Sequence, residues 1–215
     1  MNVVPAIKFA RPDELPEGFL YRDDFLSEPE ESELLGIFQK LDFNAYDYHG
    51  YQAKRRVVRF GVNYDINTSA LNDAQPIPDY LLGIRARAAE FARVRSVGNS
   101  TAIPAAHEIS PDDLVQAMVS EYSIGTPIGW HRDAPQFGII IGISLGSACR
   151  MRLKPYSSRS ESRGKILSLL LEPRSIYVMK GEARSAWQHS IPAVEQLRYS
   201  ITFRTLRSGL KERAA

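Results

Sequence analysis

One histidine and one aspartate, His131 and Asp133, stand two positions apart in the segment GWHRD. In an extended segment residues i and i+2 point to the same side, so this imidazole and this carboxylate can meet at one point. A second histidine would complete a set of two histidines and one carboxylate. That set suits a non-haem Fe(II) oxygenase, because it leaves coordination positions open for a cosubstrate and O₂. Alone, the tripeptide is common by chance, and a surface ion pair is the simpler explanation.

Three other histidines could supply the third ligand. His49 lies in a tyrosine-rich segment, and His107 lies in a connection rich in proline and alanine. His189 lies in WQHSIP, after one predicted strand and before the last one. We therefore choose His189 as the third candidate ligand.

The segment RYSITFR near the C-terminus places polar residues at alternate positions of a predicted strand, with apolar residues between them. Two arginines on the inner side of a sheet are costly to bury unless anions accompany them. A dicarboxylate such as 2-oxoglutarate would provide one carboxylate for each arginine, and arginine binds carboxylates through two hydrogen bonds. The alternatives are a sheet edge with solvated arginines or a structural Arg204–Asp133 pair. The polar face comprises Arg198, Ser200, Thr202 and Arg204.

Together these motifs resemble those of the AlkB-type Fe(II)- and 2-oxoglutarate-dependent dioxygenases, which show H-x-D, a distant H and R-x-N-x-T-x-R. The resemblance is strong over about 115–206, where IIGISLG and GEARSAWQHSIP also match, and weaker over 44–64, which resembles a substrate-recognition flap. It implies Fe(II) bound by His131, Asp133 and His189. It also implies contacts to 2-oxoglutarate from Arg198, Arg204, Tyr122, Ser120 and Ser200.

The sequence departs from the family pattern at three places. Ser200 replaces the asparagine of the last motif, and Ser120 stands where an asparagine is common. Serine reaches less far, so weaker or water-mediated binding of 2-oxoglutarate is expected. After H-x-D, some DNA-repair members carry an acidic residue, whereas this chain has Ala134-Pro135. Base recognition is therefore expected to differ from that of the best-known repair enzymes.

The activity that the resemblance implies is oxidative demethylation or dealkylation of N-alkylated nucleobases in DNA or RNA. The reaction consumes O₂ and 2-oxoglutarate and releases formaldehyde, succinate and CO₂. Two alternatives remain: the same iron chemistry acting on a protein or small molecule, and a jelly-roll binding protein without turnover. The second is disfavoured because all three ligands and both arginines are present.

Candidate substrate contacts lie in the flap and beside the proposed ligands. Tyrosines could stack on an extruded base, or they could pack the flap on the core. Basic residues could contact phosphates, although strand alternation places Arg55 and Arg59 opposite Lys54 and Arg56. Trp130 could contact substrate or pack in the core, and Arg184 could touch substrate or brace the metal loop. The complete set is Tyr46, Tyr48, Tyr51, Lys54, Arg55, Arg56, Trp130 and Arg184.

The spacing of apolar residues changes along the chain and indicates the helices and strands that position these candidate residues. Ser27 and Glu30 form a helix-capping pattern, and apolar residues at helical spacing follow them up to Leu41. Apolar residues at the same spacing predict a second helix over 78–95. From about 114 the period is two, which predicts strands over 114–122, 137–145, 149–154, 166–171, 176–179 and 197–206. We expect a mainly β protein with helices (α+β), a double-stranded β-helix or jelly roll with N-terminal helices packed on the sheet. Residues 1–215 are predicted to form one domain, with helical support and flap over about 1–110 and a jelly-roll core over about 111–206.

Composition narrows the class of protein. One cysteine in 215 residues excludes a disulfide framework, and no apolar run is long enough for a membrane span. No signal peptide is evident, so a cytoplasmic monomer with no membrane partner is expected. Residues 1–50 carry 4 basic and 11 acidic side chains, while residues 150–215 carry 14 and 5. The basic part would attract a polyanion such as nucleic acid, or it could pair internally with the acidic part.

Overall fold

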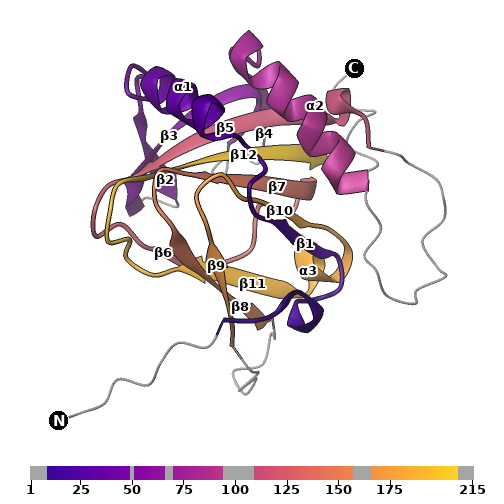
Figure 1. Cartoon of the computed structure of the whole chain (residues 1–215). Coiled ribbons are helices and arrows are strands. Elements are labelled where there is room, and N and C mark those ends of the chain that lie inside the picture. Colours follow the sequence, from indigo (N-terminus) through magenta and orange to yellow (C-terminus); the bar gives the residue numbers. More distant parts are fainter. Residues whose placement is uncertain (1–8, 49–50, 66–69, 94–108, 157–165, 208–215) are drawn as a thin grey trace.

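The computed structural model describes residues 9–48, 51–65, 70–93, 109–156 and 166–207. Two helices, α1 (Glu28–Phe38) and α2 (Asp79–Arg93), lie together on one side of the larger of two sheets (Figure 1). Helix α1 begins at Ser27, whose hydroxyl accepts from the Glu30 N–H while the Glu30 carboxylate accepts from the Ser27 N–H. Three single-turn helices are η1 (Pro12–Glu14), η2 (Pro111–Asp113) and α3 (Gly181–Ser185).

The strands form two sheets in which the paired strands are antiparallel. The larger sheet has the order β1-β10-β7-β12-β5-β3-β2, with β4 paired to β3, and the smaller has the order β6-β11-β8-β9. The small sheet lies on the side of the large sheet opposite the two helices (Figure 1). The bounds are β1 (Phe19–Arg22), β2 (Asn44–Tyr48), β3 (Tyr51–Asp65), β4 (Ala70–Asp73), β5 (Leu114–Tyr122), β6 (Ile128–His131), β7 (Phe137–Leu145), β8 (Cys149–Pro155), β9 (Leu167–Leu171), β10 (Ile176–Met179), β11 (Trp187–Ile191) and β12 (Arg198–Leu206).

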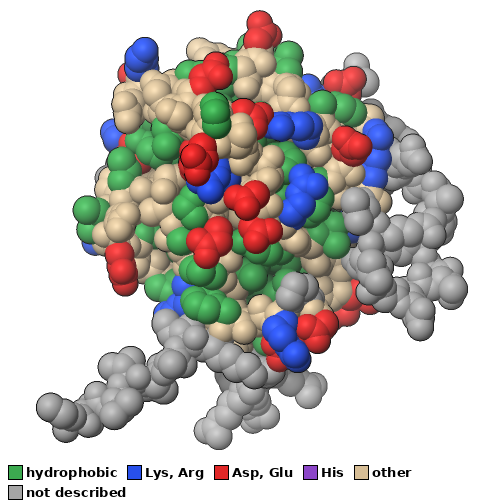
Figure 2. Space-filling model, viewed as in Figure 1, with side chains coloured by type: hydrophobic (Ala, Val, Ile, Leu, Met, Phe, Trp, Pro, Cys, Tyr) green, Lys and Arg blue, Asp and Glu red, His purple; other side chains and the backbone are tan. Residues whose placement is uncertain are grey.

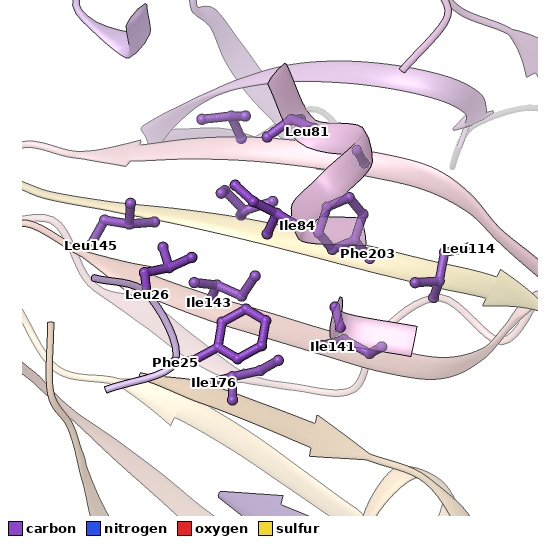
Figure 3. Close-up of a cluster of buried hydrophobic side chains, with 14 of the residues drawn as sticks. Phe25, Leu26, Leu81, Ile84, Leu114, Ile141, Ile143, Leu145, Ile176 and Phe203 are labelled. Carbon is purple, nitrogen blue, oxygen red and sulfur yellow. The ribbon is translucent and has the colours of Figure 1, made fainter. Parts of the chain in front are cut away.

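Strand alternation divides the interior into an apolar layer and a polar layer. On β12, Tyr199, Ile201 and Phe203 belong to one buried cluster with residues of both helices, and Figure 3 shows Phe203 within it. That cluster also contains Leu81 and Ile84 of α2, so one helix face and one sheet face are buried together. The alternate residues of β12 point the other way, toward the small sheet. The large sheet therefore presents an apolar face to the helices and a partly polar face to the space between the sheets.

The corner between the large and small sheets depends on one glycine. Gly146 follows β7 with φ +84°, a left-handed conformation that glycine adopts without strain. Its N–H donates to the Glu31 carboxylate of α1 at 2.9 Å, and Arg174 donates to the same carboxylate at 3.3 Å. Helix α1 is thus fastened to the corner at which the chain leaves one sheet for the other.

These observations confirm the predicted fold class, both helices and the six predicted strands. Strands β1 to β4, β6 and β11 were not predicted individually, because they are short or lie in segments without a clear period of two. The polar segment 157–164 between β8 and β9 lies outside the described residues. No helix among the described residues is long and apolar enough to cross a membrane.

Candidate metal and cosubstrate site

Two paired strands of the small sheet bring the candidate metal ligands together. In the antiparallel register of β6 and β11, His131 lies opposite His189, and their ring centroids are 4.3 Å apart. Asp133 follows two residues after His131, just beyond the end of β6. Each of the three side chains offers one ligand atom, and these atoms all lie within 4.8 Å of one another. This arrangement can hold a metal ion on one face and leave further coordination positions open.

The two imidazoles are in the form that binds metals. Burial lowers the pKa of His189 to about 3, with nearby His131 as the next cause, and burial also lowers the pKa of His131. Both rings are therefore neutral near pH 7. The Nδ1 of His131 lies 2.9 Å from the Gly129 carbonyl, which can only accept, so Nδ1 carries the proton and Nε2 keeps its lone pair for a ligand.

Asp133 is held by an arginine of the last strand. Arg204 Nη2 lies 2.9 Å from Asp133 Oδ1, and Arg204 Nη1 donates to Gln116 Oε1 at 2.7 Å. Burial alone would raise the pKa of Asp133, but the charge of Arg204 and the two imidazoles lower it below its usual range. The second oxygen, Oδ2, lies 3.8 Å from His189 Nε2. The Arg204–Asp133 pair considered from the sequence is thus present, and it leaves Asp133 ionised and facing the histidines.

The second inward arginine, Arg198, is buried with unused hydrogen-bonding capacity. Its side chain is 1 % exposed; Nε donates to Ser144 Oγ at 3.3 Å, and Nη1 has no partner among the described residues. The guanidinium stands over the Tyr122 ring, and the Tyr122 hydroxyl lies 3.4 Å from Ser200 Oγ. A buried, incompletely paired guanidinium calls for an anion. A carboxylate of 2-oxoglutarate fits this requirement.

The three candidate metal ligands and the Arg198 side chain all line one cavity of about 1030 Å³ between the two sheets. Burial alone would raise the pKa of Tyr122 at its floor, but the charges of Arg55 and Arg198 lower it. Asp133 is the only carboxylate among the described lining residues. The lining cations are Lys54, Arg55, Arg59, Arg132, Arg184, Arg198, Arg204 and Arg207. The cavity is therefore strongly positive and suits an anionic ligand.

Only some of the predicted substrate residues line the cavity. Lys54 and Arg55 line it, whereas Arg56 lies on the other side of β3 and pairs with Glu121 at 2.7 Å. In the register of β3 with β5, Arg56 lies opposite Glu121 and is directed toward it, so its contact with substrate stays a prediction. The side chains of Tyr46, Tyr48 and Tyr51, with His49 and His107, lie outside the described residues.

Arg184 and Trp130 make protein contacts that the sequence left open. Arg184 is buried, and its Nη2 donates to the carbonyls of Asp133, Ala134 and Phe137 at 3.2, 2.8 and 2.9 Å. These hydrogen bonds fix the segment 133–137, which carries the candidate metal ligand Asp133. Trp130 is at the cavity wall, and its ring lies against cations of β8 rather than in either core cluster.

Sequence reasoning overlooked several cavity residues. Gln116 shares the inward face of β5 with Ser120 and Tyr122, so alternation along 114–122 could have identified it. Ser144 could not be found that way, because its contact with Arg198 depends on the register between β7 and β12. Ser120, predicted to contact 2-oxoglutarate, is fully buried, and its hydroxyl has no partner among the described residues.

Two facing antiparallel sheets with this residue cluster between them define a jelly-roll oxygenase of the non-haem iron class. Residues 21–204 match the 2OG-Fe(II) oxygenase superfamily, and the chain belongs to that superfamily. This superfamily uses Fe(II), 2-oxoglutarate and O₂, and the chain is similar to AlkB-like proteins.

Two similar proteins have names that describe a function on nucleic acid. The chain is 28% identical over 180 residues to the mouse tRNA (carboxymethyluridine(34)-5-O)-methyltransferase ALKBH8, covering 82% of this chain and 24% of that protein. It is 27% identical over 192 residues to the Alkylated DNA repair protein ALKBH8 homolog of Arabidopsis thaliana, covering 81% and 51%. The chain thus spans a quarter to a half of these relatives. The structure of OsALKBH1 superposes with a TM-score of 0.66 at 18% identity, covering 89% of this chain and 98% of that one.

Proposed function

We propose that this enzyme removes alkyl groups oxidatively from nitrogen atoms of nucleobases in DNA or RNA, in a repair or demethylation role. The observation that carries the proposal is the charge at the cavity. Arg204 is occupied by Asp133, Arg184 by carbonyl groups, and Arg198 is buried deep enough to serve 2-oxoglutarate. Lys54, Arg132 and Arg207 also line the cavity, as do Arg55 and Arg59, which have partners of their own. An excess of this size beside an active site suits a polyanionic substrate.

The wall of the cavity also suits a flat base. Met118, Phe137, Ile140 and Met151 contribute apolar surface above the metal cluster, and the volume is in the range of sites for small ligands. Strand β3, which contributes Lys54 and Arg55, forms the wall that the sequence assigns to a substrate flap. A base turned out of its stack could enter while its phosphates stay among the cations outside. The nucleic-acid names of two relatives support the same substrate class.

In this proposal each buried polar group has one task. His131, Asp133 and His189 would hold Fe(II), and Arg198 with Tyr122 would bind the distal carboxylate of 2-oxoglutarate. Arg204 keeps Asp133 ionised and oriented through its 2.9 Å contact. Bound iron with 2-oxoglutarate and O₂ would supply the oxidation of the alkyl carbon, giving succinate and CO₂, and the hydroxylated product would lose formaldehyde. The proposed enzyme is a monomer located in the cytoplasm.

A panel of methylated substrates tests the proposal. The enzyme is supplied with Fe(II), 2-oxoglutarate and O₂ and mixed with N-methylated bases in single-stranded DNA, duplex DNA or RNA. Mass spectrometry follows the bases, while succinate is measured in parallel. We expect one succinate for each methyl group lost, and little stimulation by the matched unmethylated strands. The variant His131→Ala should lose both signals, because one ligand of the cluster is removed.

Two results would count against the proposal. If none of the methylated strands stimulates succinate release, the nucleic-acid assignment is wrong. If peptides or small molecules stimulate release instead, the same iron site serves the alternative substrate class. Lys40→Gln is the control, because Lys40 is exposed just after α1 and does not line the cavity.

A further inference from the structure

The outer face of the small sheet carries a row of cations along β8. Arg150, Arg152 and Lys154 are partly exposed, and they alternate with the buried Cys149, Met151 and Leu153 of the inner face. Alternate residues of one strand are about 6.8 Å apart, which suits the repeat of an extended polyanionic chain. None of these three cations pairs with a carboxylate in the part of the chain that the structure describes.

Aromatic rings accompany these cations. The guanidinium of Arg152 lies 5.0 Å and Lys154 Nζ 4.5 Å from the centre of the Trp130 ring. Arg132 lies 3.7 Å from the centre of the Tyr156 ring at the end of the same strand. These contacts restrict the long side chains, so less conformational entropy is lost when the cations meet an anion. We call the six residues the basic-aromatic face: Trp130, Arg132, Arg150, Arg152, Lys154 and Tyr156.

The geometry of β6 explains why Trp130 belongs to this face. Three residue steps separate Ile128 from His131 on β6, whereas two separate His189 from Ile191 on β11, so a bulge interrupts the pairing. The bulge lets both Ile128 and His131 face the cavity, and Trp130, next to His131, covers the outer side. Arg152 Nε also donates to Ser190 Oγ at 3.0 Å, and Ser190 is fully buried on the outer side of β11.

The basic-aromatic face continues into the cavity. Trp130 and Arg132 flank His131 in sequence, and both line the cavity. By contrast, the side of the molecule seen in Figure 2 shows basic and acidic side chains interspersed. The cations of β8, which have no carboxylate partner among the described residues, lie where a chain leaving the cavity would cross the small sheet.

We propose that the basic-aromatic face binds the single-stranded nucleic-acid segment next to the base held in the cavity. This inference rests on the proposed function and adds a second contact region to it. Arg150 and Lys154 would contact successive phosphates, and Arg132 would lie between them and the cavity. Cations interleaved with aromatic rings are the combination that single-stranded nucleic acids require, since phosphates and base planes are both available.

The first experiment measures binding of an unmodified, fluorescently labelled single-stranded DNA by anisotropy at several salt concentrations. Lys154→Glu and the double variant Arg150→Glu with Lys154→Glu reverse charges on the face, and Lys40→Glu reverses one after α1. We expect affinity to fall about tenfold or more for the double variant and to change less than about twofold for Lys40→Glu. The plot of log association constant against log salt concentration has a negative slope. Its magnitude should decrease by about 0.7 for each cation removed.

The second experiment separates docking from the chemistry. Turnover is compared for a long methylated oligonucleotide and for a methylated trinucleotide, which extends only one nucleotide to either side of the base in the cavity. Lys154→Glu should raise KM for the long substrate and leave kcat, and the rate on the trinucleotide, close to wild type. Circular dichroism checks that the variants remain folded.

Each other outcome overturns the inference in a recognisable way. Equal losses in Lys154→Glu and Lys40→Glu would show a general charge effect. Competition by polyglutamate as strong as that by the oligonucleotide would assign the face to an acidic protein partner. Normal wild-type turnover of methylated strands with unchanged binding in the variants would remove only this inference. Absence of wild-type turnover on every methylated strand would remove the proposed function as well.

Discussion

Replacing Arg184 with methionine tests whether a buried guanidinium positions the metal ligand Asp133. Methionine keeps an unbranched apolar side chain but removes the donor that reaches the carbonyls of Asp133, Ala134 and Phe137. Those carbonyls belong to the turn that leads from Asp133 into β7. Without the donor, the turn loses its tie to α3, and Asp133 loses part of the scaffold that holds it near the histidines.

The expected loss follows from three contacts of unequal quality. The bonds at 2.8 and 2.9 Å are well formed and the one at 3.2 Å is weaker, while bonds to a charged donor contribute about 1.5–3 kcal/mol each. Burial lowers the pKa of Arg184, which means that the guanidinium is desolvated and that part of this gain is offset. We therefore expect Arg184→Met to lower the free energy of unfolding by about 2–4 kcal/mol.

Urea unfolding of the metal-free protein measures the loss of stability, and titration with Co(II) measures the loss of metal affinity separately. Arg11→Met is the control, because Arg11 is exposed and its ion pairs lie on the surface, so its change should stay below about 0.5 kcal/mol. We also expect Co(II) affinity to fall about tenfold or more in Arg184→Met. A variant with wild-type stability and wild-type Co(II) affinity would refute the reasoning. Lost stability with unchanged Co(II) affinity would restrict Arg184 to a folding role.

Three further predictions concern the same cavity. Arg198→Met should weaken 2-oxoglutarate binding at least about a hundredfold by calorimetry on the Co(II)-loaded protein, and Arg198→Lys should recover only part of it. Arg204→Met leaves Asp133 buried without its cation, so stability to urea near pH 7 should fall by about 3–5 kcal/mol, whereas an unchanged midpoint would contradict the role of the pair. Because burial lowers the pKa of His131 and His189, protons compete weakly with metal. Co(II) binding should therefore persist as pH falls from 7 to about 5.5, below the usual histidine pKa of about 6.5; its loss near 6.5 would contradict the pKa directions.

Local signals in the sequence were sufficient for much of the fold. The Ser27 cap with Glu30 marks the start of α1, and period-two runs predict β5, β7, β8, β9, β10 and β12. The polar face of β12 was also predictable, because alternation alone separates Arg198 and Arg204 from the apolar residues between them. These features depend on neighbours in the chain, and therefore a single sequence contains them.

Contacts between distant strands were harder to predict. Arg56 was assigned to the substrate because its charge was visible, whereas Glu121 became its partner only through the register of β3 with β5. The common inward position of Ile128 and His131, three residues apart, depends on the bulge opposite β11, which no local pattern indicates. The meeting of His131 with His189 likewise requires two short strands to pair, so the choice among the histidines relied on context rather than on spacing.

The edge position of β6 has a consequence for the lifetime of the protein. Among the described strands, this four-residue strand pairs with β11 alone, and it carries one candidate ligand while β11 carries another. A bound ion would act as a cross-link between segments far apart in the chain, and ligand at a hundred times its Kd adds about 2.7 kcal/mol to stability. Loss of iron would then loosen the edge of the small sheet first and expose it to proteases.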